Sequence, residues 1–246
     1  MYLSLCKFRM NRFKYHKRSS EEPVPEETTE DLTTYTSVDP EDNFTITSNK
    51  LTVTDIHPDH TTTYLYYDFG EGYFKKNFEI RFALKVTAIW EDHALQGIIG
   101  VANSLTLNPG GPNIEINYDY TGAGSGANYD IEVGGGAHVA HTYINDFLIG
   151  TTYYCKFERI YVGGAEDNIV QLTVYTDDAY TVRAKKIYMN PPGADLPTWG
   201  EDDFTLAEAT ETYRYLMLAT SSRDSHSETI VGSFEISDVE IISNTD

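Results

Sequence analysis

Short alternating runs of β-branched and aromatic residues, separated by turn residues, recur along most of this chain. In "NFTITSNKLTVTDI", residues 43–56, apolar residues occupy alternate positions on either side of "SNK", which predicts a β-hairpin. Roughly a dozen such runs follow one another between residues 37 and 242, and no long helical period interrupts them. A parallel sheet needs crossover helices, so the pattern predicts an all-β sandwich of two antiparallel sheets.

Two runs indicate which side chains should reach the core. In "FEIRFALKVTAIW", residues 78–90, alternation places six residues on one face: Phe78, Ile80, Phe82, Leu84, Val86 and Ala88. In "TTYYCKFERIYV", residues 151–162, Tyr153, Cys155 and Phe157 share a face. Cys155 is therefore expected to be a buried free thiol, and a bridge to Cys6 in the N-terminal arm is not expected.

Charge is distributed unevenly along the chain, which has 18 basic and 38 acidic residues and a formal net charge of −20. The first 20 residues hold six basic residues and no acidic one: Lys7, Arg9, Arg12, Lys14, Lys17 and Arg18. The remainder is strongly acidic, which repels phosphate backbones and excludes nucleic acid as its partner. Residues 1–20 are predicted to form a basic arm, and the preferred interpretation is a disordered or weakly docked tail. The alternatives are an assembly arm that docks on an acidic partner or on the acidic body, and a misassigned start, since Met10 is another possible initiator.

Residues 21–37 are acidic and rich in Pro and Thr, which is typical of a linker or an extended lead-in. The predicted organisation is an arm over 1–20, a linker over 21–37 and one sandwich over 38–246. No apolar run is long enough to span a bilayer, and the start does not resemble a secretory signal.

Three segments carry a resemblance: "FEIRFALKVTA", "TTYYCKFERIYVGGAEDNIVQLTVYTDD" and "YLMLATSS" followed by "GSFEISDVEI". In pattern and order they resemble the concanavalin A-like lectin/glucanase superfamily, including laminin-G-like jelly rolls, over residues 38–242. The resemblance implies a jelly-roll sandwich with one concave sheet, and ligands held on the concave face or rim. It also implies a setting on a virion or a cell exterior, since such domains recur in phage, viral and secreted bacterial proteins.

The closing run "VGSFEISDVEII" places Glu235, Asp238 and Glu240 inside an apolar strand. Its alternation slips near Asp238, and a β-bulge there would restore one apolar face and gather the three acids on the other. Laminarinase-type glucanases of the superfamily use a bulged acidic strand with the acids in the reverse order. A solvated strand face is therefore the preferred interpretation, and catalysis is not expected.

Metal-binding patterns are weak in this sequence. Asp177, Asp178 and Asp167 lie in acidic loops of the kind that bind calcium, but without the spacing of a known calcium loop. The "HVAH" of residues 138–141 has a spacing that suits a helix better than a strand, so zinc is not expected. No cofactor is predicted, and calcium is the one metal that the loops allow.

Aromatic residues near turns are the candidate ligand contacts, because glycans bind to aromatic faces and to amide and carboxylate edges. Trp199 lies in a Pro- and Gly-flanked loop, Trp90 ends a long strand, and Tyr118, Tyr120 and Tyr129 surround the Gly-rich "TGAGSGAN".

Three functions follow from these observations. The preferred one is a non-catalytic jelly-roll module that binds glycan or decorates a virion or cell surface. The alternatives are a purely structural assembly subunit, anchored by its basic arm, and a glycan hydrolase of laminarinase type. The opposite charges of arm and body favour self-association, so the expected partners are glycans or neighbouring subunits, most simply in a homo-oligomer.

Overall fold

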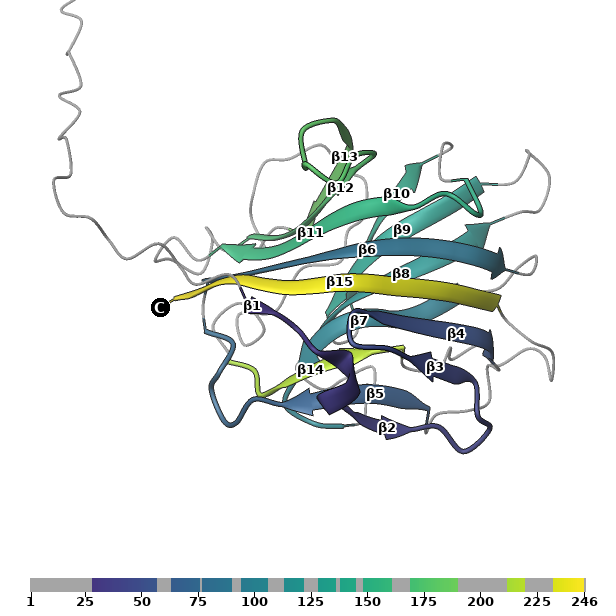
Figure 1. The fold of residues 1–246 in the computed structure, drawn as a ribbon. Helices are drawn as coiled ribbons and strands as arrows, with labels where there is room; N and C mark the ends of the chain where they lie inside the picture. The colour runs from purple at the N-terminus through teal and green to yellow at the C-terminus, as the bar shows by residue number, and fades with distance from the viewer. Residues whose placement is uncertain are drawn as a thin grey trace, which may run out of the picture.

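The structure, a computed structural model of the chain, describes residues 28–56, 63–75, 77–89, 94–105, 113–121, 128–135, 138–144, 148–160, 169–189, 212–219 and 232–245. In these ranges the regular elements are β-strands, apart from a three-residue 3-10 turn, η1 (Leu32–Thr34). The strands form two antiparallel sheets that pack face to face (Figure 1). The predicted all-β sandwich of two antiparallel sheets is thus confirmed.

The first sheet has eight strands, with β1 attached to β15 outside the main order. In spatial order they are β13 (Arg183–Met189), β12 (Ile169–Tyr175), β11 (Tyr153–Ile160), β6 (Asn77–Ile89), β15 (Gly232–Thr245), β4 (Lys50–Ile56) and β3 (Phe44–Ile46), with β1 (Thr28–Thr29) beside β15. The long strands β6 and β15 lie side by side across the middle of this layer (Figure 1).

The second sheet has seven strands and lies behind the first in the view of Figure 1. In spatial order they are β10 (His138–Ile144), β9 (Asn128–Gly135), β8 (Asn113–Thr121), β7 (Ala94–Ala102), β14 (Tyr215–Leu218), β5 (Tyr64–Asp68) and β2 (Thr36–Val38).

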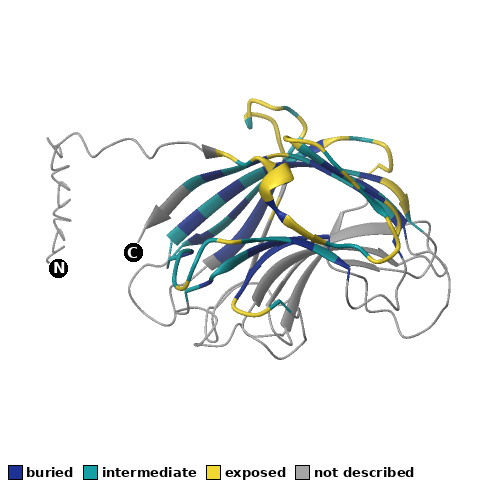
Figure 2. Ribbon diagram, turned by 60° about the horizontal axis from the view of Figure 1, so that its bottom comes forward, coloured by how far each residue is buried: buried dark blue, intermediate teal, exposed yellow. Residues whose placement is uncertain are grey.

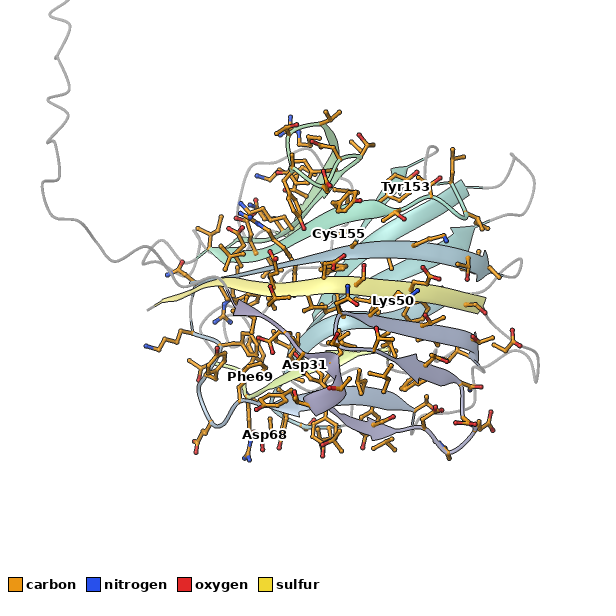
Figure 3. All side chains as sticks on the ribbon, viewed as in Figure 1. Asp31, Lys50, Asp68, Phe69, Tyr153 and Cys155 are labelled. Carbon is orange, nitrogen blue, oxygen red and sulfur yellow. The ribbon has the colours of Figure 1, made fainter. Side chains whose placement is uncertain are left out.

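The core lies between the sheets, and buried residues alternate with half-buried or exposed ones along the strands (Figure 2). β11 shows the period of two most clearly: Tyr153, Cys155 and Phe157 are buried, while the residues between them are half-buried. The prediction for this strand is confirmed, and Cys155 is a buried free thiol. Figure 3 labels Tyr153 and Cys155 on this strand.

On β6 the predicted core face is correct for all residues but one. Phe78, Ile80, Phe82, Leu84 and Val86 are buried, as predicted. Ala88 is exposed, so its assignment to the core face was wrong. The cause is a shift in the pairing of β6 with β15, where Ser233 pairs with Ala88 but the next residue, Phe234, pairs with Val86.

The segment expected to be a linker or a lead-in contributes to both sheets in its second half. β1 pairs with β15, and β2 pairs with β5 of the other sheet. Between them, Asp31 begins the η1 turn by accepting a hydrogen bond from the Thr33 amide, and Leu32 is fully buried. Residues 1–27, including the basic arm, lie outside the described residues.

Candidate functional site

Backbone register across β10, β9 and β8 brings polar residues from distant parts of the sequence into neighbouring rows. His141 pairs with Glu132, which pairs with Asn117. In the next row, Tyr143 pairs with Asp130, which pairs with Asp119. Facing residues in an antiparallel ladder have Cβ atoms about 4.5–5.5 Å apart and share one face of the sheet. Residues of four polar types, which are histidine, tyrosine, asparagine and acidic residues, therefore occupy facing register positions on three strands.

These rows belong to the face of the sheet that is turned away from the core. Ile99 and Val101 of β7 are buried in the core, and they pair with Ile116 and Ile114 of β8. Successive residues of a strand alternate between the two faces. Asn117 and Asp119 therefore occupy the outer face, and the residues that pair with them on β9 lie on the same side. We call His141, Glu132, Asn117, Tyr143, Asp130 and Asp119 the polar rows.

The other half of the same outer face is aromatic. Tyr64 and Tyr66 of β5 and Tyr215 of β14 form a chain of ring contacts, with centroids 5.8 Å and 5.9 Å apart. All three side chains are half-buried. Met217 lies next to them and is fully buried, and it pairs with Gly100 of β7. Gly100, which has no side chain, thus lies between the tyrosines and the polar rows on β8 to β10.

An ion pair between Arg214 and Asp68 lies at the edge of the aromatic half. Both guanidinium nitrogens Nε and Nη2 of Arg214 donate to the Asp68 carboxylate, at 2.6 Å each. This bidentate bond holds the pKa of Asp68 below its usual value. The same guanidinium lies 5.1 Å from the centroid of the Tyr215 ring, so it fixes the end of the row of tyrosines. Figure 3 labels Asp68 at this edge of the molecule.

The tyrosines that the sequence suggested as ligand contacts lie on the opposite face from the polar rows. Tyr118 and Tyr120 have the same parity on β8 as the core-facing Ile116, and Tyr120 pairs with Tyr129 of β9. Their register favours packing between the sheets over contact with a ligand. Trp90 and Trp199 lie outside the described residues.

The acids of the closing strand also have a definite place. β15 carries the predicted bulge: pairing with β6 shifts between Ser237 and Glu240, and Asp238 has a left-handed φ of 54°. Phe234, Ile236, Val239 and Ile241 are all buried, so the bulge restores one apolar face. The acids belong to the outer face of the eight-stranded sheet.

On that face the Glu235 carboxylate forms two ion pairs. Its carboxylate lies 3.9 Å from Lys50 Nζ and 3.8 Å from Lys85 Nζ. The Asp238 amide donates to the Asn49 carbonyl at 2.9 Å, and Glu240 pairs in register with Arg81. Glu235 is thus an ion-paired residue on the outer strand face, and Asp238 is held there by a backbone hydrogen bond.

The outer face of the eight-stranded sheet continues as a network of balanced charges. Lys156 lies 3.1 Å from Glu79 and 2.8 Å from Glu158. Burial lowers the pKa of Lys156, but the two carboxylates outweigh it and the net shift is upward. Arg81 donates to Glu79 at 2.9 Å and lies 5.0 Å from the Tyr180 ring centroid. The charges of Glu79, Arg81, Lys156 and Glu158 are therefore satisfied by one another.

The suggested calcium ligands do not come together among the described residues. Asp177 closes the turn between β12 and β13 by accepting bonds from the Thr181 hydroxyl (2.5 Å) and the Val182 amide (2.7 Å). These bonds lower the pKa of Asp177. In the described ranges no three His, Cys, Asp or Glu side chains form a group that could hold a metal. Asp178 is exposed, and Asp167 lies outside the described residues.

Comparisons with known proteins confirm the fold. No protein-family model and no curated protein match the chain. A double mutant of the alginate lyase Aly36B, in complex with an alginate trisaccharide, matches with a TM-score of 0.57 at 10% identity, over 90% of this chain and 100% of that chain. The enzymatically active domain of tailspike protein 2 from bacteriophage CBA120 matches with a TM-score of 0.51 at 9% identity, over 89% of this chain and 30% of that chain. At these identities the similarity shows the fold alone, which is a jelly-roll sandwich of two antiparallel sheets, as predicted.

The sequence contained a pattern that would have found the polar rows. "NIEINYDY", residues 113–120, alternates strictly between apolar and polar residues, and "YDIEV", residues 129–133, does the same. Alternation alone separates the tyrosines from the acids on these strands. Only the register between strands could show that His141, Glu132 and Asn117 form one row.

Among the described residues, no helix has the length and apolarity that a membrane crossing requires.

Proposed function

We propose that this protein is a carbohydrate-binding jelly roll without catalytic activity, and that the outer face of the seven-stranded sheet is its binding face. The observation that carries the proposal is the register that gathers imidazole, amide, phenol and carboxylate groups in two adjoining rows. Such groups bind sugar hydroxyls through hydrogen bonds, and carboxylates accept two at a time.

The aromatic half supports the same proposal. A pyranose ring has apolar C–H faces that pack on aromatic rings, while its hydroxyl edges need polar partners. Tyr64, Tyr66 and Tyr215 lie on the same outer face as the polar rows, with Gly100 between them. A glycan chain laid across the strands would meet aromatic contacts at one end and hydrogen-bonding groups at the other.

A non-catalytic role agrees with the state of the closing strand. The hydrolase alternative needed an acid and a nucleophile on β15, and there Glu235 is engaged by two lysines. We propose that the protein acts at the surface of a virion or a cell, where a glycan-binding module would attach or display it. The structural subunit remains an alternative, since the basic arm over residues 1–20 offers a means of attachment to an assembly.

The test is glycan binding by calorimetry, with two matched variants. Asn117→Ala removes an amide from the middle of the polar rows, while Thr45→Ala changes an exposed residue of β3 on the other sheet. We expect the Asn117→Ala variant to bind glycan with at least tenfold lower affinity than the parent. This change corresponds to the loss of one or two hydrogen bonds of about 1 kcal/mol each. Thr45→Ala should bind like the parent. Equal binding by the parent and both variants would place the site elsewhere.

One specific observation favours a hydrolase as the second candidate. Asp119 and Asp130 are directly opposite each other, at a Cβ spacing of about 4.5–5.5 Å for facing positions. Retaining glycosidases hold their two carboxyl groups about 5–5.5 Å apart. Release of reducing ends from a glycan panel, lost in both Asp119→Asn and Asp130→Asn, would establish this candidate. Binding without release of reducing ends would support the non-catalytic proposal.

A further inference from the structure

The seven-stranded sheet contains no lysine or arginine in any of its strands, which are β2, β5, β7, β8, β9, β10 and β14. The same strands hold five carboxylates: Asp68, Glu115, Asp119, Asp130 and Glu132. By alternation, the four on β8 and β9 share the outer face, because Glu115 pairs with Gly100 and Gly134 in a row parallel to the polar rows. The polar rows also contain one histidine, His141.

The eight-stranded sheet has the opposite composition. Its strands hold six acidic residues against eight lysines and arginines, which are Lys50, Arg81, Lys85, Lys156, Arg159, Arg183, Lys185 and Lys186. The basic residues of the folded part are therefore concentrated on one layer. Beside the seven-stranded sheet, Arg214 does not offset the acids of the polar rows, since its guanidinium is bound to Asp68.

From this separation of charge we infer that the proposed glycan site selects ligands by charge, binding amine-bearing glycans most tightly, uncharged glycans less tightly and uronate glycans least. The inference rests on the proposed function. A charge about 7 Å from one carboxylate in water changes affinity about threefold, and four carboxylates act in the same direction. The structural similarity to an alginate lyase therefore does not extend to the ligand, because alginate is a polyanion that this face would repel.

The chemistry of the site predicts the same order of affinities for the three classes of glycan. Two facing carboxylates repel each other when both are ionised, and an ammonium group placed between them relieves that repulsion. A neutral sugar satisfies the hydrogen bonds of the rows but leaves the repulsion in place. A uronate adds a further negative charge, and these seven strands hold no lysine or arginine to receive it.

The test uses three hexasaccharides with the full-length protein at pH 6: chitosan hexamer, which carries amines, N-acetylated chitohexaose, which is the same backbone without charge, and oligomannuronate. We expect the amine form to bind at least tenfold tighter than the uronate at 50 mM salt. The difference between the charged ligands should shrink at 1 M salt, where the Debye length falls to about 3 Å, while binding of the neutral hexamer changes little.

A pair of double variants separates this local effect from attraction to an acidic protein as a whole. Asp119→Asn with Asp130→Asn removes two charges from the polar rows, and Glu235→Gln with Glu240→Gln removes two from the other sheet. We expect the first pair to lower the ratio of amine to neutral affinity at least threefold, and the second pair to leave it unchanged.

The outcomes distinguish the inference from the proposal beneath it. Equal loss of the ratio in both double variants, or a uronate that binds as tightly as the amine form, would overturn the inference and leave glycan binding intact. Failure of all three ligands to bind, together with a wider glycan panel, would overturn the proposed function, and the inference with it.

Discussion

Deletion of a single residue should show whether the acids of the closing strand belong to a bulge on a solvated face. Removing Asp238 should leave the fold intact, because Asp238 is the extra residue of that bulge. In β15, Ser237 pairs with Ala83 and Glu240 with Arg81, so two residues lie opposite one. After the deletion, Ser237, Val239 and Glu240 would face Ala83, Phe82 and Arg81 in unbroken register. Val239 and Ile241 would stay in the core, where they are now buried.

The energy terms of this deletion are small and of opposite sign. It removes one backbone bond, from the Asp238 amide to the Asn49 carbonyl, worth about 1 kcal/mol. It also removes a non-glycine residue with a φ of 54°, a conformation that costs about 1–2 kcal/mol. We therefore expect the free energy of unfolding to change by less than about 1.5 kcal/mol.

Deletion of Glu235, three residues earlier, is the matched control. No extra residue lies opposite β6 at this point, so the chain must either turn Phe234 to the outer face or form a new bulge. Phe234 is 1% exposed, and its exposure alone costs about 1.5–3 kcal/mol. Urea unfolding followed by circular dichroism should therefore separate the two deletions by about 2 kcal/mol or more. Equal destabilisation would refute the bulge and the face assignment that depends on it.

Further predictions concern the core, the turn and the arm. Phe157→Ala should lower the free energy of unfolding by about 3–5 kcal/mol, since Phe157 is fully buried and packs against Phe78; a loss below 1 kcal/mol in urea unfolding would contradict this. Cys155 should resist a thiol reagent until the protein unfolds, because burial raises its pKa; labelling of the native Cys6→Ser variant would contradict burial. The pKa of Asp177 is lowered in the folded state, so its hydrogen bonds stabilise the turn fully above the unperturbed pKa of about 3.9. This stabilisation is lost as pH falls through the lower folded-state pKa. The amide resonances of Thr181 and Val182 should therefore shift on acidification in the parent but not in Asp177→Asn. Deletion of residues 1–20 should leave the melting temperature of the body nearly unchanged and alter its assembly instead; loss of the folded spectrum would assign the arm to the core.

The two sheets could be predicted from the sequence because local pattern and long-range packing agree in most strands. The "SNK" hairpin joins β3 to β4, where the Thr47 amide donates to the Lys50 carbonyl at 2.8 Å. The bulge at Asp238 could also be predicted, since it alone reconciles Ile236 and Val239 with one apolar face. Ala88 was assigned to the wrong face because a register shift depends on the neighbouring strand, which no single run of sequence contains.

The candidate site was harder to predict, because residue type alone does not show which face of a sheet a residue occupies. Aromatic residues near a Gly-rich loop drew attention to Tyr118, Tyr120 and Tyr129, although the alternation of "NIEINYDY" already placed the first two with Ile116. The acids of the same strands were counted only as part of a general negative charge. His141 was considered only with His138, and residues three apart on a strand lie on opposite faces.

Net charge alone describes this chain as acidic, but the strands divide that charge unevenly between the two layers. Surface electrostatics acts on a ligand within about 10 Å at ordinary ionic strength, so the local sheet matters more than the sum over the chain. On the eight-stranded sheet, lysines and arginines neutralise the acids in pairs, as Lys156 does between Glu79 and Glu158. On the seven-stranded sheet, the acids of β8 and β9 have no lysine or arginine in any neighbouring strand. Since like charges in facing positions destabilise a sheet, their presence in adjoining rows is better explained by a ligand that meets them than by stability.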